Sequence, residues 1–436
     1  MPRSIQTIFQ EFVEKKVPIF KDRNALTSHF TPETIPHRDK QINDLATILA
    51  PSLKGGRPSN IFVYGLTGTG KCVIGPTLVY LANPGPVSIQ SIVDNNRSKL
   101  IEKSLDYSIY SPSRSLIVYS IGNKLNIVKD KIIYLYKEKA PEKLVKIKTT
   151  SGREIITSLK HPFQILKNGI LGFKNSIHLK KNDFIAIPRI IPVERRSTHL
   201  SFTKNFYEVN SGFVLVKDGC NPIKKINKSD EDLAEFLGIM IGEGTCRYYG
   251  HYYIAITNKN PLIIEKIRKI FDRFKLGYRI QESKKQPGLK EIIVSSKTFY
   301  YYLKEVLGYP VNKLSHQKEV PKIIFSSSIN IRSAFLRGLF ETDGYISKRD
   351  PVIEYSTSSP TLSNQVLYLL LNFGIVGRLK VKEKERKHFR IIVSGKQFLK
   401  KFKKKIGFMS KEKTRRLKQH LKKKDNTNVD VIPNIG

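Results

Sequence analysis

The chain has 436 residues and a formal net charge of +40 at pH 7. Its length allows roughly two to four domains. No apolar run is long enough to cross a membrane and the N-terminus lacks a signal-peptide pattern, so we expect a cytoplasmic protein without a membrane partner. Its three cysteines, Cys72, Cys220 and Cys246, lack the spacing of a metal site or a disulfide framework. Most of the positive charge follows residue 71 and favours a nucleic-acid partner, with a general lysine bias as the alternative.

The first 71 residues end in a nucleotide-binding motif. An apolar strand is expected over Asn60–Tyr64, and the sequence GLTGTGK follows it. Such a loop holds phosphates with backbone N–H groups and a lysine. The residues expected to bind ATP are Gly65, Gly68, Gly70 and Lys71. The next residue should be Ser or Thr to bind Mg²⁺, but it is Cys72, and the proline-rich sequence after it predicts no helix. A glycine-rich turn without nucleotide is the alternative.

The residues before this loop resemble a known ATPase family. Most of residues 18–71, including the element PHRDKQI at 36–42, resemble the N-terminal part of archaeal replication initiators of the origin-recognition and cell-division-control AAA+ family. The resemblance stops at Lys71, and the acidic motif, sensors and later domains of such an ATPase do not follow. The resemblance therefore implies that ATP binds only to the spliced host protein.

Residues 72 to about 190 are short segments broken by Gly, Pro and Asn. This pattern indicates an all-β domain. The expected strands are Ser115–Tyr119, Ile132–Tyr136, Leu144–Thr149 and Glu154–Thr157. Three blocks in this region (72–79, CVIGPTLV; 152–166, GREIITSLKHPFQIL; 177–189, IHLKKNDFIAIPR) resemble the inteins, whose splicing domain has the Hint-type fold.

The resemblance to inteins implies acyl-shift chemistry at Cys72. Its thiol would attack the preceding carbonyl and convert the amide to a thioester. His161 is expected to protonate the departing nitrogen, and a hydroxyl of Ser158 or Thr157 to bond the carbonyl oxygen. The family pattern has a threonine three residues before the histidine, where this chain has Ser158, so both hydroxyls remain candidates. A buried core thiol and a structural histidine are the alternatives.

Splicing by an intein also needs a C-terminal His-Asn pair. The segment 425–436 ends in NVDVIPNIG and contains no such pair. We therefore expect no splicing by this chain alone, and a separate C-terminal intein fragment is a candidate partner.

An internal repeat occupies residues 230–424, after a connector at 191–229. FLGIMIGEG (Phe236–Gly244) is echoed by LRGLFETDG (Leu336–Gly344), and further matched blocks follow in the same order. The two copies cover about 230–320 and 330–424 and alternate helices with strands, including an amphipathic helix over Leu262–Phe274.

The repeated blocks resemble the paired motifs of LAGLIDADG homing endonucleases. Gly238 and Gly242 share one helical face, as do Gly338 and Thr342, so two helices can approach closely. Glu243 and Asp343 each precede a glycine expected to end its helix, and two such carboxylates would bind Mg²⁺. The resemblance makes Lys318 an active-site lysine. Its partner in the second copy is one of Lys411, Lys413 and Lys418.

The resemblance to these endonucleases implies cleavage of double-stranded DNA at the intein-free allele of the host gene. The alternatives are a DNA-binding module that no longer cleaves and helices whose acids are only structural caps. The sequence predicts five consecutive parts: a partial α/β P-loop segment (1–71), an all-β Hint-type splicing domain (72–190), a connector (191–229), a duplicated α/β LAGLIDADG endonuclease (230–424) and a truncated C-terminal segment (425–436).

Overall fold

The computed structural model describes residues 72–423, apart from 123, 168, 195–198, 284–285 and 384–386. The chain divides into two compact units, Met1–Ser59 and Asn60–Gly436, and every described residue belongs to the second. The expected ATP-binding residues Gly65, Gly68, Gly70 and Lys71 lie outside the described residues, as does the segment 425–436. Within the described residues, no helix has both the length and the apolarity needed to cross a membrane.

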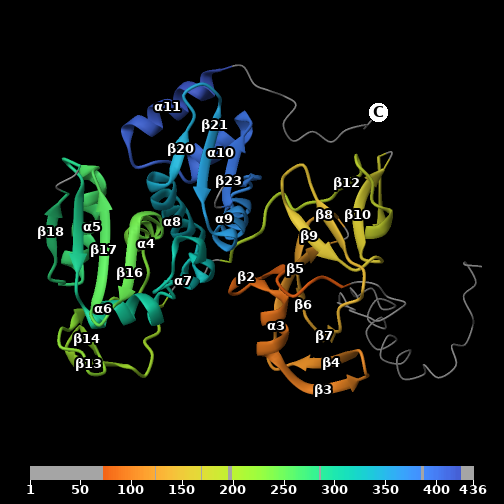
Figure 1. Cartoon of the computed structure of the whole chain (residues 1–436), viewed down its shortest axis with the longest axis horizontal. Helices are drawn as coiled ribbons and strands as arrows, with labels where there is room; N and C mark the ends of the chain where they lie inside the picture. Colours follow the sequence, from red (N-terminus) through yellow and green to blue (C-terminus); the bar gives the residue numbers. More distant parts are fainter. Residues whose placement is uncertain are drawn as a thin grey trace, which may run out of the picture. The chain divides into compact units, whose positions relative to one another are not determined.

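Small antiparallel sheets fill residues 78–185 (Figure 1). One has the order β2-β1-β5-β6 and comprises β1 (Leu78–Leu81), β2 (Gly85–Ser88), β5 (Ile117–Ile121) and β6 (Ile127–Lys131). Another has the order β3-β4-β7 and comprises β3 (Arg97–Lys103), β4 (Tyr107–Pro112) and β7 (Leu135–Glu138). β8 (Val145–Lys148) pairs with β9 (Glu154–Thr157). The last sheet has the order β11-β10-β12 and comprises β10 (Pro162–Lys167), β11 (Ile170–Asn175) and β12 (Phe184–Ile185).

The strand predictions for this region are confirmed in part. Glu154–Thr157 is β9, and Leu144–Thr149 contains β8. The prediction of one strand over Ile132–Tyr136 is wrong, because residues 132–134 form an irregular link between β6 and β7, which belong to different sheets. Ile132 in this link and Leu135 in β7 are buried in one small core, so the run of apolar residues does not mark a single strand. The absence of a helix directly after Cys72 is confirmed, since the β1–β2 hairpin occupies that sequence.

The expectation of a purely β region is also wrong at α3 (Ile89–Asn96). Ser88 caps this helix, because its side chain accepts a hydrogen bond from the backbone N–H of Ser91 at 3.2 Å. The buried residues Ile89, Ile92, Val93 and Asn96 recur at helical spacing. This amphipathic pattern, next to a good capping residue, explains why a helix forms among strands.

The connector contains a small three-stranded sheet of its own. It consists of β13 (Phe206–Asn210), β14 (Phe213–Val216) and β15 (Ile223–Lys224).

The internal repeat is visible in the fold. The first copy runs through α4 (Glu231–Glu243), β16 (Gly244–Tyr248), β17 (Tyr252–Asn258), α5 (Pro261–Arg273), β18 (Arg279–Glu282), β19 (Lys290–Val294) and α6 (Lys297–Tyr301). The second runs through α8 (Ile329–Thr342), β20 (Gly344–Ile346), β21 (Val352–Thr357), α9 (Pro360–Asn372), β22 (Arg378–Glu383), β23 (Lys387–Ser394) and α10 (Lys396–Lys405). Their sheets have equivalent orders, β16-β17-β19-β18 and β20-β21-β23-β22. The two segments therefore share one order of helices and strands.

Shorter elements join and extend the two copies. A π-helical turn (Tyr302–Val306), a 3₁₀ turn (Ser315–Gln317) and α7 (Lys322–Ser326) lead from α6 to α8. A further helix, α11 (Lys411–Lys422), follows α10. A 3₁₀ turn at Ser176–His178 follows β11.

Equivalent helices in the two copies begin in the same way. α5, which confirms the helix predicted over Leu262–Phe274, has proline in its first turn, and Asn260 caps it by accepting a hydrogen bond from Leu262 N. α9 also begins with proline, and Ser359 caps it by accepting from Leu362 N. Proline at the first helical position suits a helix start, because its missing N–H would have no partner there.

Candidate nuclease and splicing sites

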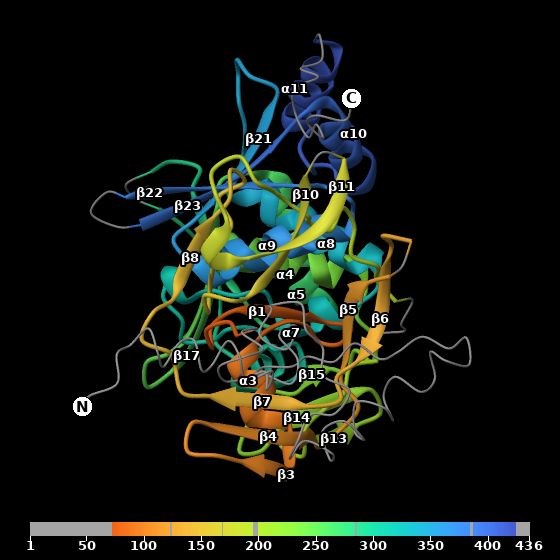
Figure 2. The ribbon, with the colours of Figure 1, turned by 90° about the vertical axis from the view of Figure 1, so that its right-hand side faces the viewer.

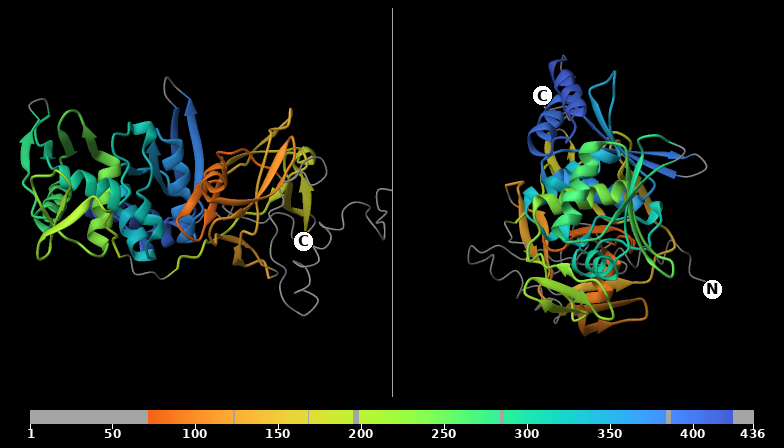
Figure 3. Two further views of the ribbon diagram at one scale, coloured as in Figure 1. Left: turned by 90° about the horizontal axis from the view of Figure 1, so that it is seen from below. Right: turned by 90° about the vertical axis from the view of Figure 1, so that its left-hand side faces the viewer.

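Two long helices, α4 and α8, pack against each other at the centre of the repeat (Figures 1 and 3). Their approach depends on glycine. A Cβ atom on Gly238 would collide with the carbonyl oxygen of Phe335, and one on Gly338 would collide with the carbonyl oxygen of Glu235. A Cβ atom on Gly242 would collide with the side chain of Thr342. The close approach expected from the sequence is therefore present, and it brings the ends of the two helices together.

Each helix of the pair runs directly into a strand. Gly244 ends α4 with φ −87° and ψ 150°, which is extended rather than left-handed backbone. Gly244 therefore ends its helix, as the sequence predicts, without left-handed backbone. Glycine is required at position 244 for a steric reason, because a Cβ atom there would collide with the carbonyl oxygen of Met240. A Cβ atom on Gly344 would likewise collide with the carbonyl oxygen of Phe340.

Glu243 and Asp343 occupy the adjacent ends of the pair. Burial raises the pKa of the Glu243 carboxyl; the hydrogen bond from the Asn258 amide opposes this rise, and the negative charge of Asp343 adds to it. Burial also raises the pKa of Asp343, against the positive charges of Lys318 and Lys413. The Glu243 side chain is half-buried and that of Asp343 reaches the surface, but nearby protein atoms displace water from both carboxyls, so each is less stable in its charged form than it would be in water.

Two lysines cap the helix ends that carry these acids. Lys318 Nζ donates to the carbonyl oxygens of Ile241 (2.6 Å), Gly242 (3.1 Å) and Gly244 (3.3 Å). Lys413 Nζ donates to those of Phe340 (3.2 Å), Glu341 (2.5 Å) and Gly344 (2.8 Å). The last carbonyls of a helix lack partners within it and carry negative partial charge, so an ammonium group is favourable there.

The structure distinguishes between the three lysines considered for the second copy. Lys413 lies at the end of α8, and its charge acts on both Glu243 and Asp343. Lys411 and Lys418 lie on the same helix, α11, but their side chains are exposed. Burial lowers the pKa of both Lys318 and Lys413, and the nearby carboxylates oppose this change. The two acids and two lysines thus form one compact charged group.

The composition of this group fits a divalent cation. No cluster of three or more His, Cys, Asp and Glu side chains able to hold a metal occurs among the described residues. Mg²⁺ needs no such cluster, because it is commonly held by one or two carboxylates together with water and substrate phosphates. A cation between Glu243 and Asp343 would offset the raised free energy of their charged forms.

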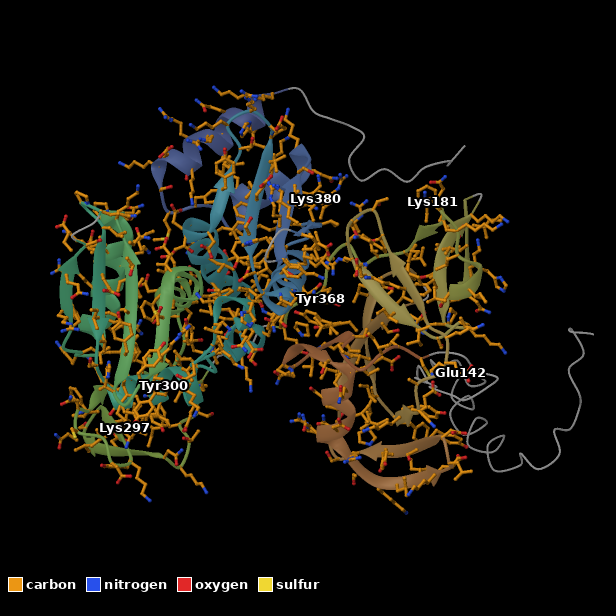
Figure 4. The ribbon with its side chains drawn as sticks, viewed as in Figure 1. Glu142, Lys181, Lys297, Tyr300, Tyr368 and Lys380 are labelled. Carbon is orange, nitrogen blue, oxygen red and sulfur yellow. The ribbon has the colours of Figure 1, made fainter. Side chains whose placement is uncertain are left out.

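The sheet faces that point away from the helices carry polar and basic side chains. In the second sheet, β22 and β23 lie side by side (Figure 2), and Lys380 is labelled in Figure 4. Lys380 pairs with Arg390 and Lys382 with His388, and the alternation of side chains along a strand places all four on one face. The opposite face of the same strands carries the buried residues Leu379 and Ile391. A sheet face with regularly spaced cations is suited to phosphate contacts along DNA.

The first sheet has an equivalent but less basic face. Arg279 and Gln281 point to it from β18, with Tyr253 and Glu291 beside them. The carboxylate of Glu291 accepts hydrogen bonds from Tyr253 Oη (2.7 Å) and from Gln281 Nε2 (2.6 Å). Its charge is therefore partly compensated within the sheet.

The proposed splicing residues meet where β9 ends. Cys72 N donates to Ser158 Oγ at 3.2 Å, and Ser158 N donates to Cys72 O at 2.9 Å. Ser158 thus contacts the nitrogen of the amide that an acyl shift would break. The carbonyl oxygen of that amide belongs to Lys71, outside the described residues. Cys72 itself is buried, with 8% of its surface exposed.

The hydroxyl of Thr157 bonds to residues other than Cys72. It lies 2.8 Å from Ser176 Oγ and donates to Ser158 O at 3.1 Å. Ser176 Oγ in turn donates to the carbonyl oxygen of His161 at 2.8 Å. Of the two hydroxyls considered from the sequence, the structure brings that of Ser158 to Cys72 and places that of Thr157 in a buried network behind His161.

Three residues at these sites were not expected from the sequence. Asn258, at the end of β17, donates to Glu243, and Ser176 joins Thr157 to His161. Glu341 is buried within the second motif itself. Of these, only Glu341 gives a signal in the sequence, because a charged residue at a core-facing position of a helix normally has a partner.

Residues 330–407 match the protein family described as LAGLIDADG-like domain. The match covers α8 to α10, which is most of the second copy of the repeat. The match thus falls on the second copy, and the first copy has the same order of helices and strands.

The relatives of the chain have dissimilar names. It is 27% identical to the replication factor C small subunit of Methanocaldococcus jannaschii, over 84% of this chain and 18% of the relative. It is 28% identical to the DNA-directed RNA polymerase subunit Rpo1C of the same organism, over 80% of this chain and 41% of the relative. It is 26% identical to a component of the A-type ATP synthase of Pyrococcus abyssi, over 80% and 33%. The chain therefore spans less than half the length of each of these relatives.

Two solved structures are similar to parts of the chain. The crystal structure of I-DmoI in complex with DNA and Mn is 21% identical, with a TM-score of 0.33, and the match covers 41% of this chain and 96% of that chain. The crystal structure of the PabCDC21-1 intein is 24% identical, with a TM-score of 0.26, and the match covers 29% and 76%.

Proposed function

We propose that this chain is an intein-containing precursor and that residues 230–424 form a homing endonuclease that cuts double-stranded DNA with a divalent cation. The observation that carries the nuclease proposal is the group formed by Glu243, Asp343, Lys318 and Lys413 at the ends of two packed helices. Each copy of the repeat contributes one acid and one lysine to the proposed site, so the two halves can serve the two strands of a duplex.

The residues of the site have separate roles in this proposal. Glu243 and Asp343 would hold the cation. When bound, the cation would supply Lewis-acid stabilisation of charge on the phosphate oxygens. Lys318 and Lys413 stay close to the acids, because the helix-end carbonyls orient their ammonium groups, and they stabilise negative charge that develops on the phosphate. The basic sheet faces hold the DNA.

The relatives are named for different functions, and this supports the proposal that the stretch they share with this chain is an inserted element. A replication factor, a component of RNA polymerase and a component of ATP synthase each align with at least 80% of this chain. Residues 72–436 make up about the same share of the sequence. Three hosts of different function are expected to share a stretch of this size if the shared stretch is a mobile insert rather than host sequence.

The proposed insertion point is the bond between Lys71 and Cys72. The contact between Cys72 N and Ser158 Oγ supports an acyl shift that begins there. The residues before it would belong to a replication-initiator ATPase of the origin-recognition type, interrupted in its phosphate-binding loop. ATP binding would then be a property of the spliced host.

The nuclease proposal is tested with a supercoiled plasmid that carries the uninterrupted phosphate-loop sequence of the host gene. Wild-type protein with Mg²⁺ should linearise this plasmid, and it should leave a plasmid with the interrupted sequence intact. Failure to cut the uninterrupted plasmid with Mg²⁺ or Mn²⁺ would reject the proposal.

A second candidate is DNA binding without cleavage. It is favoured by the hydrogen bond from Asn258 to Glu243, which occupies an oxygen that a cation would need. Under this alternative the wild-type protein binds the uninterrupted sequence tightly but leaves both strands whole in every divalent cation.

A further inference from the structure

The second repeat contains a buried carboxylate that the proposed nuclease mechanism does not use. Glu341 lies on α8, and only 5% of its surface is exposed. Its Oε2 accepts hydrogen bonds from the backbone N–H groups of Met409 (2.8 Å) and Ser410 (3.1 Å). Its Oε1 lies 4.0 Å from Lys413 Nζ. A buried carboxylate is expensive in free energy unless it is paired, and all three of these partners come from one short stretch of chain.

This stretch is the beginning of α11. Ser410 caps the helix, because its side chain accepts a hydrogen bond from Lys413 N at 3.4 Å. Lys413 therefore lies in the first turn of α11. A carboxylate at a helix N-terminus is favoured by the exposed N–H groups and by the helix dipole. Glu341 thus ties the start of α11 to α8, and the lysine carried by that start reaches the end of α8.

We propose that Glu341 is a positioning residue that holds α11 and the ammonium group of Lys413 at the proposed active site. The inference rests on the proposed nuclease function and adds a residue to it. Glu341 acts through Lys413, because its own carboxylate is occupied by α11 rather than directed at the acids. The backbone of Glu341 supports the same geometry, since its carbonyl oxygen accepts a hydrogen bond from Lys413 Nζ at 2.5 Å.

The first repeat positions its lysine by another route. The residue equivalent to Glu341 is Ile241, which has no charge. Lys318 is instead held through its own carbonyl oxygen, which accepts a hydrogen bond from Ser359 Oγ at 2.6 Å. Ser359 is the capping residue of α9. The loss of the Glu341 carboxylate should therefore disturb one lysine and leave the other in place, so the two DNA strands should respond differently.

The experiment compares wild type, Glu341→Gln and Lys413→Ala on the supercoiled plasmid with the uninterrupted target. The matched control is Glu265→Gln, which removes a carboxylate from an exposed pair with Lys269 on α5. In Glu341→Gln we expect one strand to be cut at the wild-type rate and the other about 10-fold to 100-fold more slowly, so that nicked circles accumulate. The slow strand should be the one that is slow in Lys413→Ala. Glu265→Gln should linearise the plasmid like wild type.

A double-mutant cycle separates positioning from general destabilisation. If Glu341 acts through Lys413, Glu341→Gln should add no further loss to Lys413→Ala. Full additivity of the two losses, equal slowing of both strands, or wild-type cleavage by Glu341→Gln would each overturn the inference while leaving the nuclease function in place. A wild-type protein that never cuts would overturn the nuclease function and this inference with it.

Discussion

Lys318 and Lys413 hold equivalent places in the two repeats although they reach them from different kinds of segment. Lys318 Nζ donates to the carbonyl oxygen of Gly244 at 3.3 Å, and Lys413 Nζ donates to that of Gly344 at 2.8 Å. Lys318 directly follows a short 3₁₀ turn, whereas Lys413 lies in the first turn of α11. An ammonium group thus contacts the carbonyl end of each helix, although the two lysines come from different kinds of segment.

The first prediction separates the three lysines of α11. Lys413→Ala should slow the cleavage of one strand by about 100-fold, because the charge that faces Asp343 is lost. Lys411→Ala and Lys418→Ala serve as controls, and both should cut at close to the wild-type rate because their side chains are exposed. Strand-resolved cleavage of end-labelled target DNA measures all three. A loss in Lys411→Ala as large as that in Lys413→Ala would contradict the placement.

The second prediction concerns the contact between the paired helices. Gly238→Ala should lower the free energy of unfolding by about 3 kcal/mol, because the added methyl group collides with the backbone of the other helix at Phe335. Gly277→Ala is the matched control, since a Cβ atom there meets nothing within 4 Å. Urea unfolding monitored by circular dichroism gives both values. Equal stability of the two variants would show that the helices can separate without loss.

The duplication and its two acids are predictable from the sequence because the repeat preserves the order of its blocks. Glu243 and Asp343 then follow as equivalent positions. The choice of Lys413 is not predictable, since Lys411, Lys413 and Lys418 all belong to one lysine-rich stretch. Only the packing of α11 against the end of α8 distinguishes them, and that contact joins residues far apart in the chain.

The sequence also could not decide which of two adjacent hydroxyls contacts Cys72. Thr157 and Ser158 are adjacent, and adjacent residues near the end of a strand point to opposite sides. The sequence does not say which side Cys72 occupies, because this depends on the register between Val73 and Thr157. The strand expected over Ile132–Tyr136 is wrong for another reason, because Ile132 is buried in the same core as Leu135 although it lies outside any strand.

The third prediction concerns the proposed acyl shift. Ser158→Ala should slow thiol-induced release of the fragment 1–71 by about tenfold or more, because the hydroxyl that contacts Cys72 N is lost. Cys72→Ala should abolish the release, since no thioester can form. Mass spectrometry after incubation with dithiothreitol measures the fragment. Release from Cys72→Ala at the wild-type rate would show that ordinary hydrolysis, and not a thioester, breaks the bond.

The fourth prediction is that the proposed metal-binding acids oppose stability in metal-free protein. Burial raises the pKa of both Glu243 and Asp343, so each carboxyl binds protons more tightly in the folded than in the unfolded protein. The free energy of unfolding therefore falls as pH rises from the ordinary pKa of each group to its raised value. At pH values above this range both carboxyls are charged in the folded protein, and the free energy of unfolding is lowered by the full desolvation cost of both charges.

Glu243→Gln and Asp343→Asn keep the shape of these side chains and remove their charge. Each should unfold at a higher temperature than wild type in EDTA at pH 7, and the difference should vanish below the ordinary pKa values, where the wild-type carboxyls are protonated. Saturating Mg²⁺ should reverse the order, because only wild type keeps both acids that bind the cation and are stabilised by it. Both variants should cut DNA at least roughly 100-fold more slowly and still bind it, since the basic sheet faces supply the phosphate contacts. The contrary outcome is that both variants unfold at the wild-type temperature in EDTA and in Mg²⁺ and cut DNA like wild type. The two acids would then be solvated helix ends, and the metal site would have to lie elsewhere.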